Sequence, residues 1–305
     1  MIPYLLLLAA ILACAGMFIY ARWIERSRIH VTRMKYRLPD LPESLQGRRI
    51  VAFSDLHVSE DDPRGLLTKL QKRVNAENPD YICFLGDLFD NYPAFAKAWK
   101  DAHPKASEQD AVSRLRECLS GMEAGSLKAA VLGNHDYEMT GNSVVRDVLN
   151  SAGFVLLDGE SVLKNGVGIG GCADFIMADD EGEVPPIPGQ LRLLLCHEPD
   201  PALQFPRHTF DLMLSGHTHG GQVRLPVISN LYQPTRGRRF RYGSYRLDGG
   251  ARLFVTRGIG CSLLMLRLGA APEIVSIRLE AGSRARLLHD YPEKPKKSFL
   301  QDKID

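Results

Sequence analysis

A pattern that occurs five times along the chain limits what it can fold into. Each time, a short apolar segment stops and is followed closely by Asp, Asn or His. Short apolar and β-branched runs are typical of buried strands, and in open α/β sheets ligands bind outside the carboxyl ends of the strands. We therefore predict an α/β domain in which these polar residues converge on one place. The five segments are Arg49–Phe53, Tyr81–Leu85, Ala129–Leu132, Leu191–Cys196 and Leu212–Ser215.

The residues that follow these segments are of the types that bind metal ions. Neutral imidazole is the commonest metal ligand among side chains, and five of the nine histidines of the chain lie at these positions. Any single Asp after a strand also fits a helix cap or a turn, and a lone His-x-His also fits a surface loop. The repetition favours a metal site. Its candidate residues are Asp55, His57, Asp87, Asn134, His135, Asp136, His197, His217 and His219.

In their order and spacing these blocks resemble the calcineurin-like metallophosphoesterases, over about residues 48 to 280. The resemblance implies a four-layer sandwich, in which two mixed β-sheets are flanked by helices, with two divalent cations at the strand ends. It also implies a role for each residue. Asp55, His57 and His219 would hold one cation, Asn134, His197 and His217 would hold the other, and Asp87 would bridge both, while His135 would lie beside the leaving group and Asp136 would orient it.

The chemistry of such a site is phosphoester hydrolysis. Two divalent cations roughly 3.5–4 Å apart lower the pKa of a bridging water and clamp the phosphoryl oxygens during in-line attack by the bridging hydroxide. An imidazole such as that of His135 can protonate a leaving oxygen. Nitrogen and oxygen ligands without thiolate suit Mn²⁺, Fe or Zn²⁺, and we expect Mn²⁺.

The N-terminal segment predicts a membrane anchor. Residues 2–21 are almost entirely apolar and uncharged, and about 20 such residues span a bilayer as a helix. Basic residues follow this run and none precedes it, so the positive-inside rule predicts a single-pass protein of the inner membrane whose catalytic domain faces the cytoplasm. A cleaved export signal, a lipoprotein signal at Cys14 and a helix lying in the interface are the alternatives.

The expected organisation along the chain follows from these observations. We predict an anchor over residues 1–21, a basic juxtamembrane linker over 22–47, the catalytic domain over 48–288 and a disordered tail over 289–305, which is rich in Pro and Lys. The net charge of +2 argues against a general nucleic-acid-binding protein. Six scattered cysteines without a C-x-x-C pair indicate buried thiols rather than disulfides or a zinc site.

Three further segments bear on the substrate. Residues 91–110 lie between two site loops and form either a cap over the substrate or a surface insertion. Leu263–Leu266 is an apolar run that belongs to the core or contacts acyl chains. Arginines bind phosphate in a bidentate manner, so an arginine-rich loop suits a nucleotide diphosphate or a membrane surface, with a charged surface loop as the alternative. The candidate substrate-binding residues in this loop are Arg236, Arg238, Arg239 and Arg241.

Two motifs sharpen the expected function. Gly216–Val223 and Thr256–Gly260 resemble membrane-anchored bacterial members of the family, whose substrates include UDP-2,3-diacylglucosamine of lipid A synthesis. The expectation is thus a phosphodiesterase or pyrophosphatase that acts on a membrane-associated nucleotide-linked lipid. A phosphomonoesterase or phosphoprotein phosphatase is the alternative. A non-catalytic scaffold on the same fold would predict lost ligand residues, and all five blocks are complete.

Overall fold

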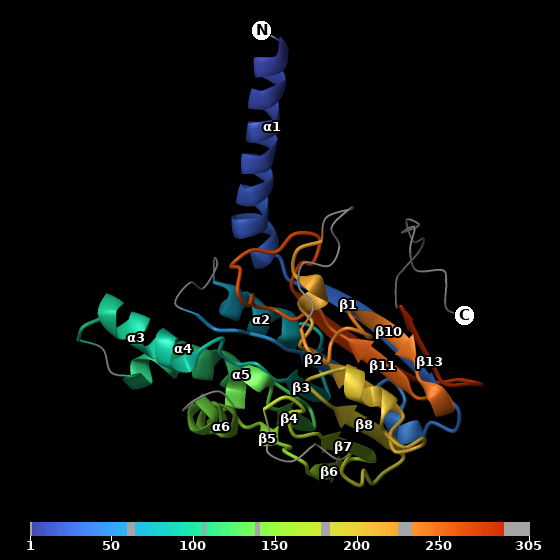
Figure 1. Cartoon of the computed structure of the whole chain (residues 1–305). Helices are drawn as coiled ribbons and strands as arrows, with labels where there is room; N and C mark the ends of the chain where they lie inside the picture. The colour runs from blue at the N-terminus through green and yellow to red at the C-terminus, as the bar shows by residue number, and fades with distance from the viewer. Residues whose placement is uncertain are drawn as a thin grey trace.

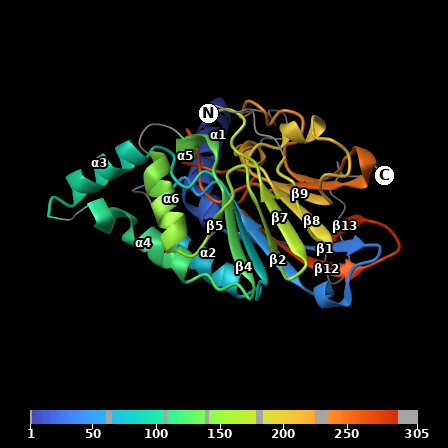
Figure 2. The same ribbon diagram turned by 90° about the horizontal axis from the view of Figure 1, so that it is seen from below.

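The computed structural model describes residues 2–59, 65–105, 108–137, 141–177, 184–224 and 234–289. Two mixed β-sheets pack face to face, with the longer helices on the outer side of one sheet and short helical turns and loops outside the other (Figures 1 and 2). The expected sandwich is therefore confirmed. The sheet next to the long helices has seven strands in the order β13 (Arg286–His289), β1 (His30–Leu38), β12 (Glu273–Ala281), β2 (Arg49–Phe53), β3 (Tyr81–Leu85), β4 (Leu127–Val131) and β5 (Val155–Leu156).

The second sheet and the helices complete the domain. The helices after the N-terminal segment are α2 (Leu66–Asn75), α3 (Tyr92–Ala102), α4 (Glu108–Ser120), α5 (Asn134–Tyr137) and α6 (Gly141–Ser151). In Figure 1, α3 and the start of α4 project from the side of the domain. The second sheet has six strands in the order β10 (Gly243–Arg246), β11 (Arg252–Val255), β9 (Leu212–Ser215), β8 (Leu191–Leu195), β7 (Val167–Gly171) and β6 (Ser161–Lys164).

Both faces of the central strands are buried over most of their length, which explains why these strands are mostly apolar. On β2, Ile50 and Ala52 point into the core between the sheets, whereas Val51 and Phe53 point into the core beneath the helices. Successive side chains of a strand point to opposite faces, so a strand covered on both sides needs an unbroken apolar sequence. This arrangement holds the strand ends in fixed positions.

Strand β1 departs from the expected organisation, because residues 30–38 were expected to lie in the linker. They instead pair in parallel with β12, from His30 opposite Glu273 to Leu38 opposite Ala281. Met34 and Tyr36 are buried between the sheets. The basic residues of the strand lie on its other face, where Arg33 pairs with Glu77. Glu77 is distant from Arg33 in the sequence, so the strand resembles a basic linker when only the sequence is read.

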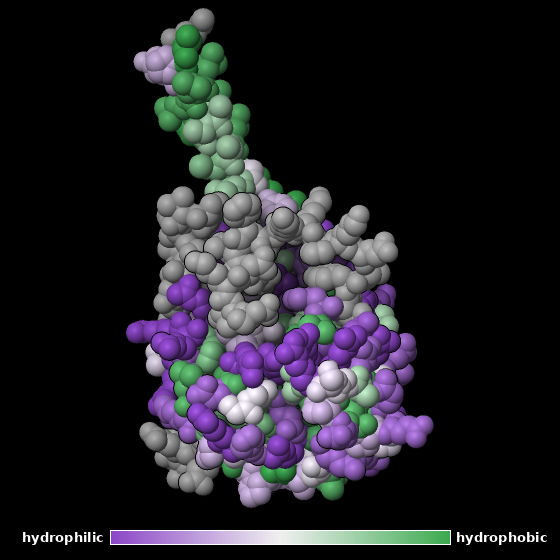
Figure 3. Space-filling view, turned by 90° about the vertical axis from the view of Figure 1, so that its right-hand side faces the viewer, coloured by the Kyte–Doolittle hydropathy of each residue, from purple (hydrophilic) through white to green (hydrophobic). Residues whose placement is uncertain are grey.

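The N-terminal helix α1 (Ile2–Ile19) stands away from the domain (Figures 1 and 3). Its side chains are exposed, and a helical segment running from Ile2 to Ser27 is long and apolar enough to cross a membrane. Short helical turns over Tyr20–Ile24 and Glu25–Ser27 connect it to the domain. The tail beyond residue 289 lies outside the described residues, as do residues 106–107 of the segment expected to be either a cap or a surface insertion.

Candidate dinuclear metal centre

Five strand ends bring the candidate ligands together. Strands β2, β3 and β4 are parallel neighbours, so the residues after them meet at one edge of the first sheet. Strands β8 and β9 are parallel neighbours in the second sheet, and they deliver His197 and His217 to the same place. The backbone is strained at many of these positions, because left-handed φ is uncommon for residues other than Gly and clusters at functional sites. Positive φ occurs at Asp55 (51°), His57 (40°), Asp87 (60°), His217 (68°) and His219 (51°).

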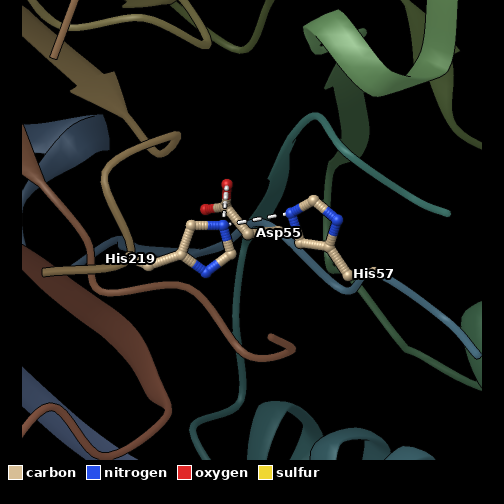
Figure 4. Close-up of side chains that lie close together, drawn as sticks. All are labelled: Asp55, His57 and His219. Atoms are coloured by element: carbon tan, nitrogen blue, oxygen red, sulfur yellow. Dashed lines mark hydrogen bonds and ion pairs between the residues drawn. The ribbon is translucent and has the colours of Figure 1, made fainter. Parts of the chain in front are cut away.

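One group of potential ligand atoms comes from Asp55, His57 and His219 (Figure 4). His57 Nε2 lies 3.1 Å from His219 Nε2, and His219 Nε2 lies 3.7 Å from Asp55 Oδ1. Atoms bound at about 2.0–2.2 Å to a single cation lie about 3.0–3.5 Å from one another. The spacing of this group therefore fits the coordination shell of one ion.

A second group comes from Asp87, His197 and His217. His197 Nε2 lies 3.1 Å from Asp87 Oδ2 and 3.3 Å from His217 Nδ1. The amide oxygen Oδ1 of Asn134 is buried and has no hydrogen-bond partner, which is costly for an oxygen that no cation approaches. Asp87 Oδ2 also lies 3.4 Å from His57 Nε2 of the first group, so this carboxylate connects the two groups.

Hydrogen bonds to backbone carbonyls determine which imidazole nitrogens remain available. The carbonyl oxygens of Leu85 and Thr235 accept from His197 Nδ1 at 2.6 Å and from His217 Nε2 at 2.7 Å. Because a carbonyl only accepts, each of these nitrogens carries the proton, and the other nitrogen of the ring keeps its lone pair. Those lone pairs, on His197 Nε2 and His217 Nδ1, belong to the second group, and this support from outside the site is typical of metal-binding histidines.

Burial and neighbouring charges set the protonation states of the candidate ligands. Burial, and then His197, lower the pKa of His217 to about 4, while burial and then His57 lower that of His219 well below its usual value. Burial by itself would raise the pKa of Asp87, but His197, His57 and His135 together lower it further than burial raises it. His217 and His219 are therefore neutral and Asp87 is ionised, which are the states that bind metal ions. Burial lowers the pKa of His197 and His57, but acidic neighbours, led by Asp87 for His197 and by Asp90 for His57, raise it further, so these two rings hold a proton that a cation would displace.

Comparisons with known proteins identify what this site belongs to. A family model described as calcineurin-like phosphoesterase matches residues 48–221. The metallophosphoesterase YkuE of Bacillus subtilis is 31% identical over 90% of this chain and 94% of its own length. The chain belongs to the calcineurin-like phosphoesterase family.

Two other relatives of this phosphoesterase have names that state an activity. The phosphodiesterase YaeI of Escherichia coli is 29% identical over 89% of this chain and 96% of its own length. The UDP-2,3-diacylglucosamine pyrophosphatase LpxG of Chlamydia muridarum is 25% identical over 86% of this chain and 92% of its own length. The enzyme is therefore a hydrolase of phosphoester bonds, and its two ligand groups fit the two-cation site of the family.

His135 and Asp136 follow Asn134 in the phosphoesterase and differ from each other in burial and in contacts. His135 is partly exposed, its Nδ1 lies 2.8 Å from Asp90 O, and its ring packs edge-on to His57 with 5.0 Å between the ring centroids. Asp136 is fully buried. Its carboxylate accepts N–H groups from Asp87 and Gly133 on Oδ2 and from Leu88 on Oδ1, at 2.8–2.9 Å. Asp136 thus fixes the loop that carries Asp87.

Glycines at the strand ends leave room for the ligands. A Cβ atom at Gly133 would lie 2.3 Å from Asp87 Oδ1, and one at Gly258, where φ is +66°, would lie 2.7 Å from the Asp55 side chain. Real Cβ atoms do not approach other atoms so closely, so any side chain at these two positions would displace a candidate ligand.

The arginine-rich loop lies against the second ligand group through its backbone. Thr235 O binds His217, and a Cβ at Gly237 would lie 3.3 Å from the His217 ring. The Asp200 carboxylate accepts backbone N–H groups from residues 238, 239 and 240 and holds this loop in place. The side chains of Arg238 and Arg239 are exposed. Their contact with a substrate stays a prediction.

Three residues outside the predicted site support it. Asp90, which follows Asp87 by three residues, has its Oδ1 3.2 Å from His57 Nδ1. Arg267 is fully buried, and its Nη2 lies 3.3 Å from His219 Nδ1. Gln222 is buried directly after the His219–Gly221 turn and binds the loop at 262–264. No pattern in the sequence distinguishes Arg267 from its surface-exposed neighbours, whereas Gln222 lies within the Gly216–Val223 motif.

Proposed function

We propose that this phosphoesterase is a phosphodiesterase or pyrophosphatase that uses two divalent cations and acts on a membrane-associated substrate such as UDP-2,3-diacylglucosamine. The observation that carries the proposal is the pair of buried ligand groups joined by the Asp87 carboxylate. The names of the relatives from E. coli and C. muridarum support diester and pyrophosphate chemistry. The apolar helix α1 supports a substrate that resides at a membrane.

Each residue of the site has a task in this proposal. When bound, the two cations supply Lewis acidity that activates water and neutralises charge on the phosphoryl oxygens. His135 is the partly exposed imidazole beside the first group, where it donates a proton to the leaving oxygen. Asp136 acts by fixing the Asp87 loop. We assign Asp55, His57 and His219 to one cation, Asn134, His197 and His217 to the other, and Asp87 to both, as proposed ligands.

The metal and the location are parts of the same proposal. The all-nitrogen-and-oxygen donor set suits Mn²⁺, and Fe and Zn²⁺ fit it as well. We propose that α1 anchors the protein in the inner membrane with the domain on the cytoplasmic side, because basic residues follow the helix. Arg236, Arg238, Arg239 and Arg241 would bind the phosphate groups of the substrate.

The test compares three substrates with one protein. The full chain, purified in detergent and loaded with Mn²⁺, is assayed on UDP-2,3-diacylglucosamine, on bis(4-nitrophenyl) phosphate and on 4-nitrophenyl phosphate. We expect hydrolysis of the first two and much slower hydrolysis of the monoester. The His135→Ala variant should lose activity, whereas His208→Ala should keep it, since His208 is exposed and lies outside the site. A preference for the monoester would replace the proposal with a phosphomonoesterase, and hydrolysis of the diester alone would remove the lipid substrate from it.

A further inference from the structure

The connection between α1 and the domain fixes where a membrane would lie. Ala21 is buried, and its carbonyl accepts the backbone N–H of Arg267 at 3.1 Å. Glu25, Arg26 and Ser27 are also buried, and the backbone N–H of His30 binds Pro272 O at 2.7 Å as β1 begins. No flexible linker separates helix and domain in this described stretch. The point at which α1 leaves a bilayer therefore also determines how far the adjacent domain surface lies from that bilayer.

A loop beside the C-terminal end of α1 exposes apolar side chains. We define the 262–266 loop as Ser262-Leu263-Leu264-Met265-Leu266, which runs at the foot of α1 (Figure 1). Leu263 is 79% exposed, more than any other large hydrophobic residue in the described part of the chain, and Leu264 is 57% exposed. The last turns of the helical segment add exposed Trp23 and Ile24, and aromatic residues at such a helix end are typical of the membrane interface.

The exposed leucines are held in position by the interior. The Gln222 amide nitrogen donates to Ser262 O at 2.9 Å and to Leu264 O at 2.7 Å, and its oxygen accepts Ser262 N–H at 3.0 Å. Leu263 has a φ of +61°, an unusual conformation for a leucine. The buried Gln222 of the Gly216–Val223 motif thus holds two leucines in an exposed position, which is costly for a surface that faces only water.

The same loop reaches the metal centre. Met265 and Arg26 line a narrow, mainly apolar pocket whose wall also includes His57 and Leu67. Arg267, the residue after the loop, contacts His219 and donates to the carbonyls of Arg257 and Gly260. The loop therefore lies between the foot of α1 and the first ligand group.

We propose that the 262–266 loop inserts Leu263 and Leu264 into the lipid interface of the leaflet from which α1 emerges. The occupant of this surface is the bilayer itself. Three observations favour it over a protein partner: the apolar helix fixed at the same level, the exposed Trp23 beside it, and the exposed Arg28 next to the helix end, where anionic lipid attracts basic groups. Together with the proposed function, insertion would hold the metal centre against the bilayer and favour phosphoesters whose apolar part stays in the membrane.

The direct test measures depth and does not depend on activity. In a Cys14→Ala background, where the five remaining native cysteines are buried, Leu263→Cys is labelled with bimane, and the full chain is reconstituted into phosphatidylcholine vesicles containing phosphatidylglycerol. Leu163→Cys is the matched control, because Leu163 is 52% exposed on β6, at the end of the domain away from α1 (Figure 1). We expect nitroxide-labelled lipid to quench the label at 263 several-fold more than that at 163, and aqueous iodide to show the reverse order.

Equal quenching by lipid at 263 and 163 would overturn the proposal, whether the leucines then face water or a protein. The same vesicles are assayed with bis(4-nitrophenyl) phosphate, so a failed insertion and a failed phosphodiesterase are separate results. A second variant, Leu263→Glu with Leu264→Glu, should lower turnover of vesicle-borne UDP-2,3-diacylglucosamine relative to that of the soluble diester by about tenfold or more, since burying one Leu is worth at least about a factor of ten. Leu163→Glu should leave this ratio unchanged, and an equal ratio in both variants would contradict insertion.

Discussion

Replacing Asp136 with Asn should weaken the metal centre without touching a proposed ligand. The Asp136 carboxylate accepts three backbone N–H groups, two on Oδ2 and one on Oδ1. An Asn that keeps its oxygen in the Oδ2 position places an NH₂ group 2.8 Å from the N–H of Leu88, so that two donors face each other. Burial, and then Asp87, raise the pKa of Asp136 to about 7, so its charge adds little at neutral pH and the main loss is the cost of a buried unpaired donor. That cost is about 1–3 kcal/mol, and since two donors face each other we expect about 2–3 kcal/mol.

The loss should be visible in stability and in metal content. For a domain of this size, it lowers the Tm by roughly 5–10 °C, and a displaced Asp87 loop should reduce metal affinity about 10–100-fold, the usual effect of removing a partner outside the ligand shell. Thermal unfolding followed by circular dichroism and metal analysis of the purified protein measure the two effects. Asp147→Asn is the control, because Asp147 is 68% exposed and its ion pair with Arg116 contributes at most about 1 kcal/mol.

The sequence resemblance had implied a different task for Asp136, that of orienting His135. If that were its main effect, Asp136→Asn would lower kcat and leave the Tm and the metal content close to those of the unchanged protein. That result would refute the assignment of Asp136 to the Asp87 loop.

Three more predictions follow from the structure. His135→Ala should lower kcat about 10²–10⁴-fold with two cations still bound, and a loss of metal would contradict its role as a proton donor. Gly258→Ala should displace Asp55 and reduce bound metal toward one ion, measured by metal analysis, whereas Gly250→Ala shares the positive φ but has nothing within 4 Å and should keep two. Burial raises the pKa of Tyr36 above its usual value of about 10. The folded protein therefore keeps a proton that the unfolded chain loses, so stability falls as pH rises above about 10, and Tyr36→Phe should make the Tm less dependent on pH there; an unchanged slope would contradict this cause.

The site and the central strands could be predicted from the sequence because local chemistry specifies them. Residues Ile50–Phe53 and Tyr81–Leu85 are apolar because both faces of their strands are buried, and the structure places strands at Arg49–Phe53 and Tyr81–Leu85. Asp and His residues that closely follow such apolar segments are easily recognised in the sequence.

The remaining features depend on contacts between distant residues. Strand β1 was expected to be part of a linker because its Arg33, Lys35 and Arg37 look like juxtamembrane charges, and their partners Glu77 and Glu280 become neighbours only in the folded sheet. The support from Arg267 could not be predicted either, since nothing near it in the sequence indicates that a fully buried guanidinium reaches His219.

The most direct test of the central claim is anomalous diffraction from crystals grown with Mn²⁺. Two peaks should appear roughly 3.5–4 Å apart, one beside Asp55, His57 and His219, the other beside Asn134, His197 and His217, with the Asp87 carboxylate between them. A single peak, or a pair of peaks that leaves Asp87 uncoordinated, would contradict the two-cation centre.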